Sequence, residues 1–224
     1  MIDIRLKTIY EEGSKLFINK GFARTQISYI ANAANISVGA VYTLFTSKKA
    51  VFDFVMKCTM DSEYIESNFE LPIKEKDFCA LDGEILALCQ RINANFEEHL
   101  SDRSYTFTNM LSDVFDIISK YGVGFLILQN NGTDCKEPYA YYVDFRKKFC
   151  ADVEKYVYRF METGEIRKLE HPKHHARLII ETLSWWGMHV KYDAFETNSN
   201  ISTETAKETA LDALFHAYSS KLRG

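Results

Sequence analysis

Apolar positions at helical spacing predict four short helices in the first 66 residues of the chain. The first helix runs over residues 3–20 and is closed by Gly21, a residue that tolerates the left-handed backbone of a helix end. Thr25 is expected to cap the second helix, because a threonine hydroxyl accepts from free amides of the first turn. The stripe of this second helix falls at i, i+3, i+4 and i+7: Ile27, Ile30, Ala31 and Ala34.

A tight turn at Asn35–Ile36 separates the second helix from the third, because asparagine tolerates the left-handed conformation nearly as well as glycine. Ser37 is expected to cap the third helix, and Ser47 to cap the fourth, which bridges to about residue 66. The inward positions predicted for the third helix are Val38, Val41 and Phe45. Two short helices joined by such a turn are typical of a helix-turn-helix unit.

The periodicity is lost over residues 67–78, around Pro72, which predicts a loop or hinge. A short buried helix punctuated by glycines is expected within residues 122–134. Other apolar stripes predict longer helices over 80–100, 104–121, 138–163, 172–195 and 203–222, the last with Leu222 on its stripe. The predicted fold class is therefore all-α, with about nine or ten helices. Two domains are expected: a helix-turn-helix domain over residues 1–57 and a larger helical bundle over residues 67–224.

Charge is distributed unevenly between these two parts. Residues 1–57 carry eight basic and four acidic side chains, a net charge of +4. The remaining residues carry 19 basic and 27 acidic side chains, a net charge of −8. A basic N-terminal part on an acidic body suits a protein whose first domain meets an anion.

The third predicted helix has unusually small residues in its first turn. Gly39 costs about 1 kcal/mol relative to alanine within a helix, so its presence indicates the close approach of another surface. Ala40 beside it is equally small, and Tyr42 and Thr43 place hydroxyl groups on the outward side. The alternative interpretation of Tyr42 is a half-buried packing residue.

Lys48 and Lys49 directly follow the Ser47 cap of the fourth helix. Cations at a helix N-terminus are disfavoured by the macrodipole by about 0.3–1 kcal/mol each. A bound phosphate would reverse that cost, because free amides and a lysine ammonium would converge on it. The alternative is a pair of solvated lysines that serve solubility.

At these positions the sequence closely resembles the helix-turn-helix of the tetracycline-repressor (TetR) family. The resemblance covers about residues 5–57, and the matching residues are Gly21, Phe22, Thr25, Ile27, Ile30, Ala31, Ala34, Ile36, Ser37, Gly39, Tyr42, Phe45, Ser47 and Lys48. The body resembles the family through its helix count, the turn GEIRK after the long helix and two closing helices.

The resemblance implies a DNA-binding transcriptional regulator and a set of DNA contacts. The predicted DNA-binding residues are Thr25, Gln26, Ser37, Gly39, Ala40, Tyr42, Thr43 and Lys48. Three residues depart from the family pattern. Asn35 replaces a turn glycine, Gln26 replaces a common threonine, and Leu44 stands where histidine or another aromatic residue is frequent. The last two are expected at the DNA-facing edge, so no operator sequence is carried over.

The resemblance also implies a homodimer, formed through the last two helices at about 172–195 and 203–222, that binds a palindromic operator. Surplus apolar residues on these helices independently favour a partner. A small, apolar or aromatic effector is expected in the body, where its binding would release a repressor from DNA. The predicted pocket residues are Phe96, Phe107, Met110, Phe125, Tyr142, Phe145 and Trp185. An activator or effector-free regulator, and a helical small-molecule-binding protein without a DNA role, stay open.

Other chemistry has no support in the sequence. The histidines 171, 174 and 175 lack acidic or cysteine partners at ligand spacing, so no metal site is predicted. Gly122–Gly124 lacks the third glycine and preceding strand of a phosphate loop. No catalytic motif is found, and neither an enzyme nor a cofactor is predicted. Five cysteines without a CxxC pair predict buried free thiols, and the absence of a signal-peptide pattern predicts a cytoplasmic protein.

Overall fold

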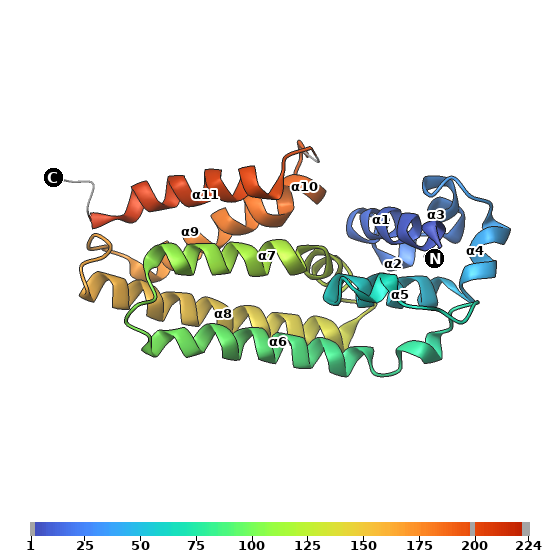
Figure 1. Ribbon diagram of the computed structural model, residues 1–224, viewed down its shortest axis with the longest axis horizontal. Helices are drawn as coiled ribbons and strands as arrows, with labels where there is room; N and C mark the ends of the chain where they lie inside the picture. Colours follow the sequence, from blue (N-terminus) through green and yellow to red (C-terminus); the bar gives the residue numbers. More distant parts are fainter. Residues whose placement is uncertain (1–2, 198–199, 221–224) are drawn as a thin grey trace. The chain divides into compact units, whose positions relative to one another are not determined.

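The computed structural model describes residues 3–197 and 200–220, and within these ranges it is helical, which confirms the all-α prediction (Figure 1). The chain forms two compact units. Unit 1 contains residues 1–88 and 123–142, and unit 2 contains residues 89–122 and 143–224. The predicted domain boundary between residues 57 and 67 stays a prediction. No helix in the described ranges is long and apolar enough to cross a membrane.

Unit 1 begins with five consecutive helices: α1 (Ile4–Asn19), α2 (Gly21–Arg24), α3 (Ile27–Ala33), α4 (Val38–Leu44) and α5 (Lys48–Met60). Two 3-10 turns follow, η1 (Tyr64–Glu66) and η2 (Glu75–Phe78). Parts of three longer helices complete the unit, namely α6 (Leu81–Glu98), α7 (Phe107–Asn130) and α8 (Lys136–Glu162). Helix α1 packs on α3 and α5, and buried side chains fill the space between them.

Local chemistry sets the ends of these short helices, as the sequence predicts. Gly21 has φ 78° after α1, and Asn35 has φ 53° in the turn after α3. The Ser37 hydroxyl accepts from the Ala40 amide at 3.0 Å, and the Ser47 hydroxyl accepts from the Ala50 amide at 3.1 Å. Each cap satisfies an amide that the first helical turn leaves free.

The segment 67–78 is anchored more firmly than the predicted loop or hinge. The Ile73 amide donates to the Leu44 carbonyl at 2.8 Å, and the Thr46 amide donates to the Ile73 carbonyl at 2.9 Å. Ile73 is itself only 2% exposed. This strand-like pairing joins the residues at the end of α4 to backbone that lies 27 residues after Thr46 in the chain. A loss of helical periodicity identified the break, but it carried no information about this long-range partner.

A single buried asparagine ties the end of α1 to the end of α7. Asn131 is fully buried, and its amide nitrogen donates to the carbonyls of Phe17 at 3.0 Å and Ile127 at 2.7 Å. Its side-chain oxygen accepts from the Phe22 amide. The chain must turn sharply at Gly21, and this one side chain satisfies backbone groups on both sides of the turn.

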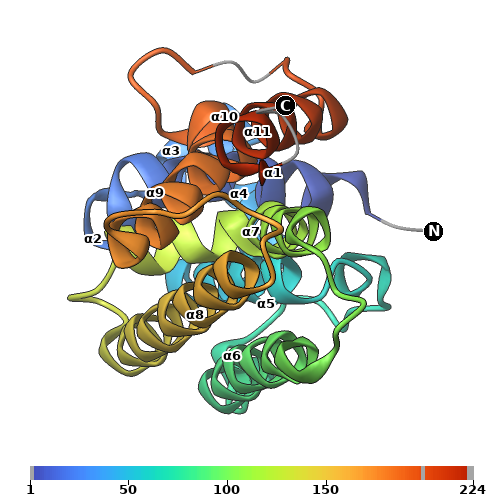
Figure 2. The same cartoon turned by 90° about the vertical axis from the view of Figure 1, so that its left-hand side faces the viewer.

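Unit 2 is built from the remaining parts of α6, α7 and α8 and from the C-terminal elements. These elements are η3 (His99–Ser101), α9 (Pro172–Ser184), the π-helical turn η4 (Trp185–His189), α10 (Val190–Tyr192) and α11 (Thr203–Tyr218). Within this unit, α9 and α11 lie on one side of α7, and α6 and α8 lie on the other (Figures 1 and 2). Pro172 occupies the first turn of α9, and Ser202 caps α11, as predicted. Leu222 lies outside the described residues.

The prediction of a separate short helix after residue 121 is wrong, because α7 is one continuous helix through both glycines. A Cβ on Gly122 would lie 2.7 Å from the Met188 Cβ, and a Cβ on Gly124 would lie 2.6 Å from the Thr59 hydroxyl oxygen. Both glycines therefore serve close packing with their neighbours. In the sequence, these glycines suggested a helix break. In the structure, close contact with neighbouring side chains is the reason for glycine at both positions.

Replacing Asn131 with alanine should destabilise the protein by about 2–3 kcal/mol, because two buried carbonyls and one partly buried amide lose their partner. Asn130→Ala is the matched control: Asn130 is exposed and donates only to the Ile18 carbonyl, at 3.0 Å. Urea unfolding of both variants measures the difference. Equal midpoints for the two variants would contradict the role assigned to Asn131.

Candidate nucleic-acid interface

Helices α3 and α4 form a two-helix unit around a tight turn. Ile30, Val41 and Leu44 are fully buried and hold the two helices together. In the turn, the Ile36 amide donates to the Ala31 carbonyl at 3.0 Å. The turn and the Ser37 cap fix the direction of α4 relative to α3. The arrangement is the helix-turn-helix that the sequence predicts.

The outward face of α4 gathers five of the eight residues predicted to bind DNA. Ser37, Gly39, Tyr42 and Thr43 are exposed, and Ala40 is half-buried. Tyr42 is 51% exposed, so about half of its side chain is accessible on this face. The Thr43 hydroxyl donates to the Ala40 carbonyl at 2.7 Å, which orients its oxygen on this face.

Gly39 is not required by any close contact inside the protein. An added Cβ would have the Ser37 hydroxyl oxygen, at 3.8 Å, as its nearest neighbour, which is ordinary contact distance. The residue also has no positive φ that would demand glycine. The cost of glycine in this helix thus has no explanation within the fold.

Thr25 does not share this face and is not the predicted helix cap. Its side chain is fully buried, and the hydroxyl donates to the Gly21 carbonyl at 2.8 Å. The N-cap of α3 is Gln26, which makes no side-chain capping bond and is exposed. Threonine at the end of α2 therefore closes that helix, while the exposed Gln26 side chain accepts from the Ser28 hydroxyl at 3.4 Å.

The two lysines that begin α5 have partners inside the protein, whereas the sequence interpretation explained them by a bound phosphate. The Lys48 ammonium donates to the carbonyls of Phe22 at 2.7 Å and Thr25 at 3.0 Å, and it lies 4.2 Å from the Phe22 ring centroid. Lys49 forms an ion pair with Asp53 one turn later. Internal carbonyls and a carboxylate thus offset the macrodipole cost, and no bound anion is needed to explain either lysine.

Two further sequence assignments are wrong because they depended on helix phase. Leu44 is fully buried, so it does not lie at a DNA-facing edge. Val38 is 40% exposed rather than inward, four residues before the exposed Tyr42. Helix α4 is only seven residues long, and its stripe is too short for the phase to be read from sequence.

Three residues that sequence reasoning missed lie exposed around α2 and α3. Lys20 places its ammonium 4.3 Å from the centroid of Tyr29, which is 37% exposed. Arg24 is exposed, and its Nε donates to the Lys20 carbonyl at 2.8 Å. No spacing rule in the sequence could have found them, because the left-handed Gly21 interrupts the helix between Lys20 and Arg24.

The residues predicted to line an effector pocket are buried, with one exception. Phe96, Phe107, Met110 and Phe145 are buried in unit 2, and Phe125 and Tyr142 stack at 5.4 Å in unit 1. Trp185 is 47% exposed, so its indole does not need the buried partner assumed from sequence. Phe96 also borders a groove of about 310 Å³ in unit 2, whose walls carry charged residues such as Arg91, Asp116 and Lys120.

The cysteines are free thiols, but not all are buried. Cys58 and Cys89 are buried, Cys135 and Cys150 are half-buried, and Cys79 is exposed. Burial raises the pKa of Cys58 to about 12 and that of Cys89 to about 11, which keeps both as neutral thiols. Among the described residues, no group of three or more histidine, cysteine or acidic side chains is placed to hold a metal ion.

Several solved structures are similar to this chain, and the first of them, with a TM-score above 0.5, shares its fold. The ketosteroid transcriptional regulator KstR2 of Mycobacterium tuberculosis matches over 98% of this chain and 97% of its own, with 14% identity and a TM-score of 0.57. AibR in complex with isovaleryl coenzyme A and operator DNA matches over 94% and 98%, with 19% identity and a TM-score of 0.47. PfmR, a TetR family transcriptional regulator from Thermus thermophilus, matches over 96% and 94%, with 18% identity and a TM-score of 0.46. No curated protein sequence matches the chain.

A family model described as bacterial regulatory proteins, tetR family, matches residues 9–55. That range begins within α1 and ends within α5, so it contains the whole helix-turn-helix. It also contains each of the predicted DNA-binding residues. By this match, residues 9–55 carry the N-terminal helix-turn-helix domain of the tetR family of bacterial regulatory proteins.

Proposed function

We propose that this chain is a ligand-responsive transcriptional repressor that binds a palindromic operator as a homodimer. The observation that carries the proposal is the outward face of α4. Gly39 there has no packing or backbone reason to be glycine, and Tyr42 is half exposed beside it. A helix of this kind fits the major groove of DNA, where a Cβ-free first turn permits close approach.

The groups on this face suit both kinds of DNA contact. The Gln26 amide and the Tyr42 and Thr43 hydroxyls can exchange hydrogen bonds with base edges or phosphates. Lys20 and Arg24 are exposed cations at the end of α1 and on α2, where they would contact phosphates. Lys48 and Thr25 contribute indirectly in this proposal, since both stabilise α2 through its carbonyls.

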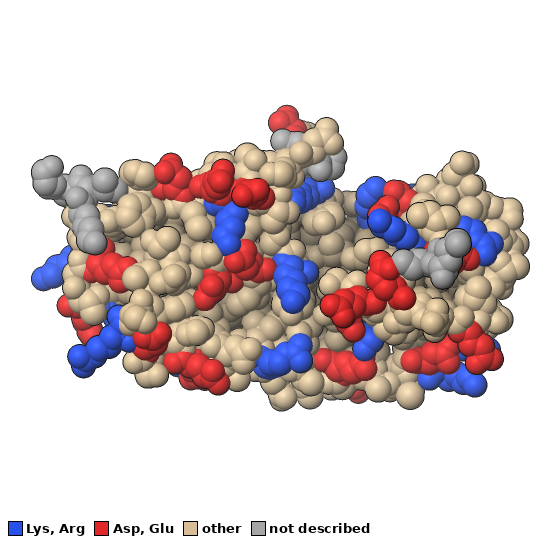
Figure 3. All heavy atoms as spheres, in the orientation of Figure 1, with Lys and Arg blue, Asp and Glu red and all other residues tan. Residues whose placement is uncertain are grey.

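Homodimerisation is proposed through α9 and α11. Leu178 on α9 is 53% exposed and Trp185, the first residue of η4, is 47% exposed. They are seven positions apart, so both lie on one side of the helix. On α11, Leu211 and Phe215 are half-buried and four residues apart. Acidic side chains lie over α11 (Figure 3), and charged groups of this kind suit the polar rim of an interface.

A small apolar or aromatic effector is proposed to bind among the buried aromatic residues of the body and to weaken DNA binding. The support is the composition of the buried core, which contains phenylalanine, tyrosine and methionine side chains. Native mass spectrometry of the protein after exposure to an apolar cell extract would identify a retained molecule. That molecule should lower operator affinity in a titration, and no retained molecule from any extract would favour the effector-free alternative.

Genomic selection with the purified protein tests the proposed function directly. Sheared DNA from the source organism is bound at low salt, recovered and sequenced, and the enriched fragments should share a palindrome. Affinity for a recovered fragment should fall steeply as salt rises, because phosphate contacts release counterions. Absence of any enriched fragment at low salt would refute DNA binding.

Replacing Gly39 with alanine should lower operator affinity roughly tenfold, a change of about 1.4 kcal/mol, because the added methyl group meets the groove wall. The fold should tolerate the change and gain up to about 1 kcal/mol of helix propensity. Gly83→Ala is the matched control, since Gly83 lies within helix α6 and a Cβ there would meet no atom within 4 Å. Fluorescence anisotropy measures affinity, and thermal unfolding measures stability.

The Gly39 result separates DNA contact from structure. A stable Gly39→Ala protein with undiminished affinity would place α4 outside the groove. A cellular effect that survives both Gly39→Ala and Tyr42→Ala would favour the alternative of a small-molecule-binding protein without a DNA role.

Replacing Leu178 with glutamate should convert the dimer to a monomer, because the charge would be buried at the proposed interface. Analytical ultracentrifugation measures the mass, and operator affinity should fall at least tenfold as one of two half-sites is lost. Leu71→Glu is the control, since Leu71 is 42% exposed and lies far along the chain from α9. A Leu178→Glu protein that stays dimeric would contradict the interface.

An activator or an effector-free regulator would use the same DNA contacts, so a cellular experiment is needed to decide between them and a repressor. Deleting the gene in a strain that carries a reporter behind a recovered operator should raise expression if the protein represses. Reduced expression would identify an activator.

A further inference from the structure

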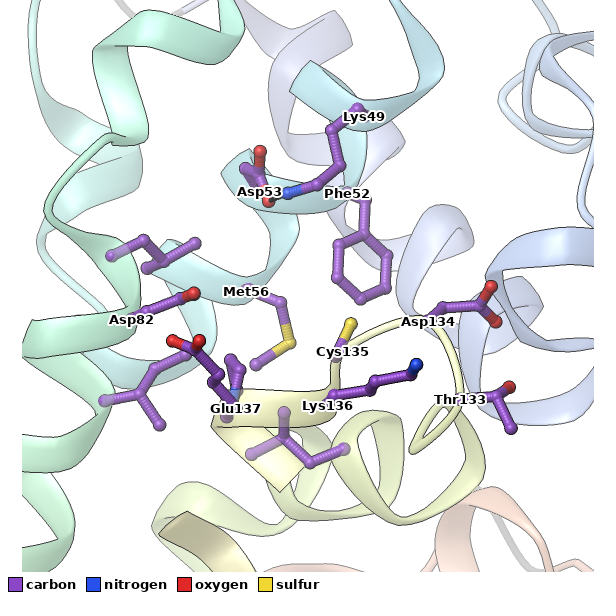
Figure 4. A pocket seen from close by; sticks show the side chains of 14 residues that line it. Lys49, Phe52, Asp53, Met56, Asp82, Thr133, Asp134, Cys135, Lys136 and Glu137 are labelled. Atoms are coloured by element: carbon purple, nitrogen blue, oxygen red, sulfur yellow. Dashed lines mark hydrogen bonds and ion pairs between the residues drawn. The ribbon is translucent and has the colours of Figure 1, made fainter. Parts of the chain in front are cut away.

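A cavity of about 330 Å³ lies within unit 1, between α5, the start of α6 and the loop that joins α7 to α8 (Figure 4). Its volume is at the lower end of the range for small-molecule sites, about 300–1,000 Å³. The aromatic residues assigned to the effector site are not part of its lining. The cavity is therefore a second concave site that the proposed function does not use.

The inner wall of the cavity is apolar. Phe52 and Met56 point into it from α5 (Figure 4), and Leu81, Ile85 and Leu128 complete the wall. All five side chains are less than 5% exposed. A molecule seated here would bury an apolar body against a preformed surface.

The charged groups of the cavity are mostly carboxylates. Asp53, Asp82, Asp134 and Glu137 line it together with two lysines, 49 and 136, so acidic groups exceed basic groups by two. Asp82, Asp134, Lys136 and Glu137 are exposed and form the outer part. An excess of negative charge over an apolar wall favours a ligand that carries a positive charge.

Asp53 is the one carboxylate that is held deep in the cavity, with its side chain only 6% exposed. Burial raises the pKa of Asp53, the hydrogen bond and charge of Lys49 oppose that rise, and the charges of Asp82 and Glu75 add to it. A buried carboxylate needs a cationic partner, because removing one partner of such a pair leaves an uncompensated charge.

Lys49 is a partner that a ligand can replace. Its side chain is 49% exposed, so its ammonium can leave Asp53 and be solvated without burying a charge. The ammonium also lies 5.9 Å from the centroid of Phe52, which shows that a cation here sits within reach of an aromatic face. An amine from solution would meet the same carboxylate and the same ring.

We propose that this cavity binds an organic ammonium ion, with a primary or secondary amine that pairs with Asp53 in place of Lys49 and an aromatic or branched apolar body against Phe52 and Met56. A metal ion does not fit, because the described residues contain no group of three ligating side chains at suitable distances. The site is separate from the DNA contacts and from the effector proposed for the aromatic core, so its test does not depend on either.

The test is calorimetric titration of the full chain, without DNA, with 2-phenylethylammonium. Neutral 2-phenylethanol and anionic 3-phenylpropanoate are the matched ligands, and each should bind at least tenfold more weakly than the ammonium ion. Equal affinity for the alcohol would overturn the proposal, because the cavity would then recognise only the apolar body.

Two substitutions should change ammonium affinity in opposite directions. Asp53→Asn should weaken binding roughly tenfold by removing the carboxylate. Lys49→Met should strengthen binding several-fold by removing the internal competitor, whereas Lys147→Met should have no effect, because Lys147 only pairs with the exposed Asp144. A general loss of stability would weaken binding in both cavity variants, so a shift in the same direction would overturn the proposal.

A third substitution keeps the test decisive if a change at the buried pair prevents folding. Asp82→Asn alters an exposed carboxylate on the same cavity, and it should weaken ammonium binding about threefold through lost long-range attraction. Unchanged affinity in Asp82→Asn, with no effect of the Asp53 or Lys49 variants that fold, would refute a cation site.

Discussion

The helix-turn-helix depends on how the backbone groups around α2 are satisfied. Helix α2 is only four residues long, so most of its amides and carbonyls have no partner within the helix. Asn131 accepts from the Phe22 amide, and the Lys48 ammonium donates to the Phe22 and Thr25 carbonyls. These two side chains come from the α7–α8 junction and from α5. Elements distant in the sequence thus fix the point at which α3 and α4 begin.

The contacts that hold α4 in place do not involve its outward face. The buried residues Val41 and Leu44 hold the helix, Ser37 caps it, and Ile73 closes its end through backbone hydrogen bonds. None of those contacts uses Gly39 or the exposed ring of Tyr42. A rigid helix with an unoccupied face is what groove recognition requires, because contacts can then be made without reorganising the protein.

Helix α5, which supports α2 through Lys48, also lines the cavity in unit 1. Lys48 points to α2, while Lys49, one residue on, reaches Asp53 at the cavity. Adjacent residues on a helix diverge by about 100°, so one turn of α5 serves two different sites. The pair of lysines that looked like a single anion-binding feature is in fact two separate structural contacts.

The sequence by itself determined the fold class, the caps at Ser37, Ser47 and Ser202, and the left-handed residues Gly21 and Asn35, because these depend on interactions within a few residues. It also singled out Gly39 and Tyr42, whose exposure the structure then established. Only the tertiary structure decided that Thr25 and Leu44 are buried, that Lys48 binds carbonyls, and that Gly122 and Gly124 lie inside one helix. The contacts of Lys48, Gly122 and Gly124 are with residues more than 20 positions away in the chain, and the burial of Thr25 and Leu44 depends on how the short helices pack. The spacing of residues within one helix does not contain this information.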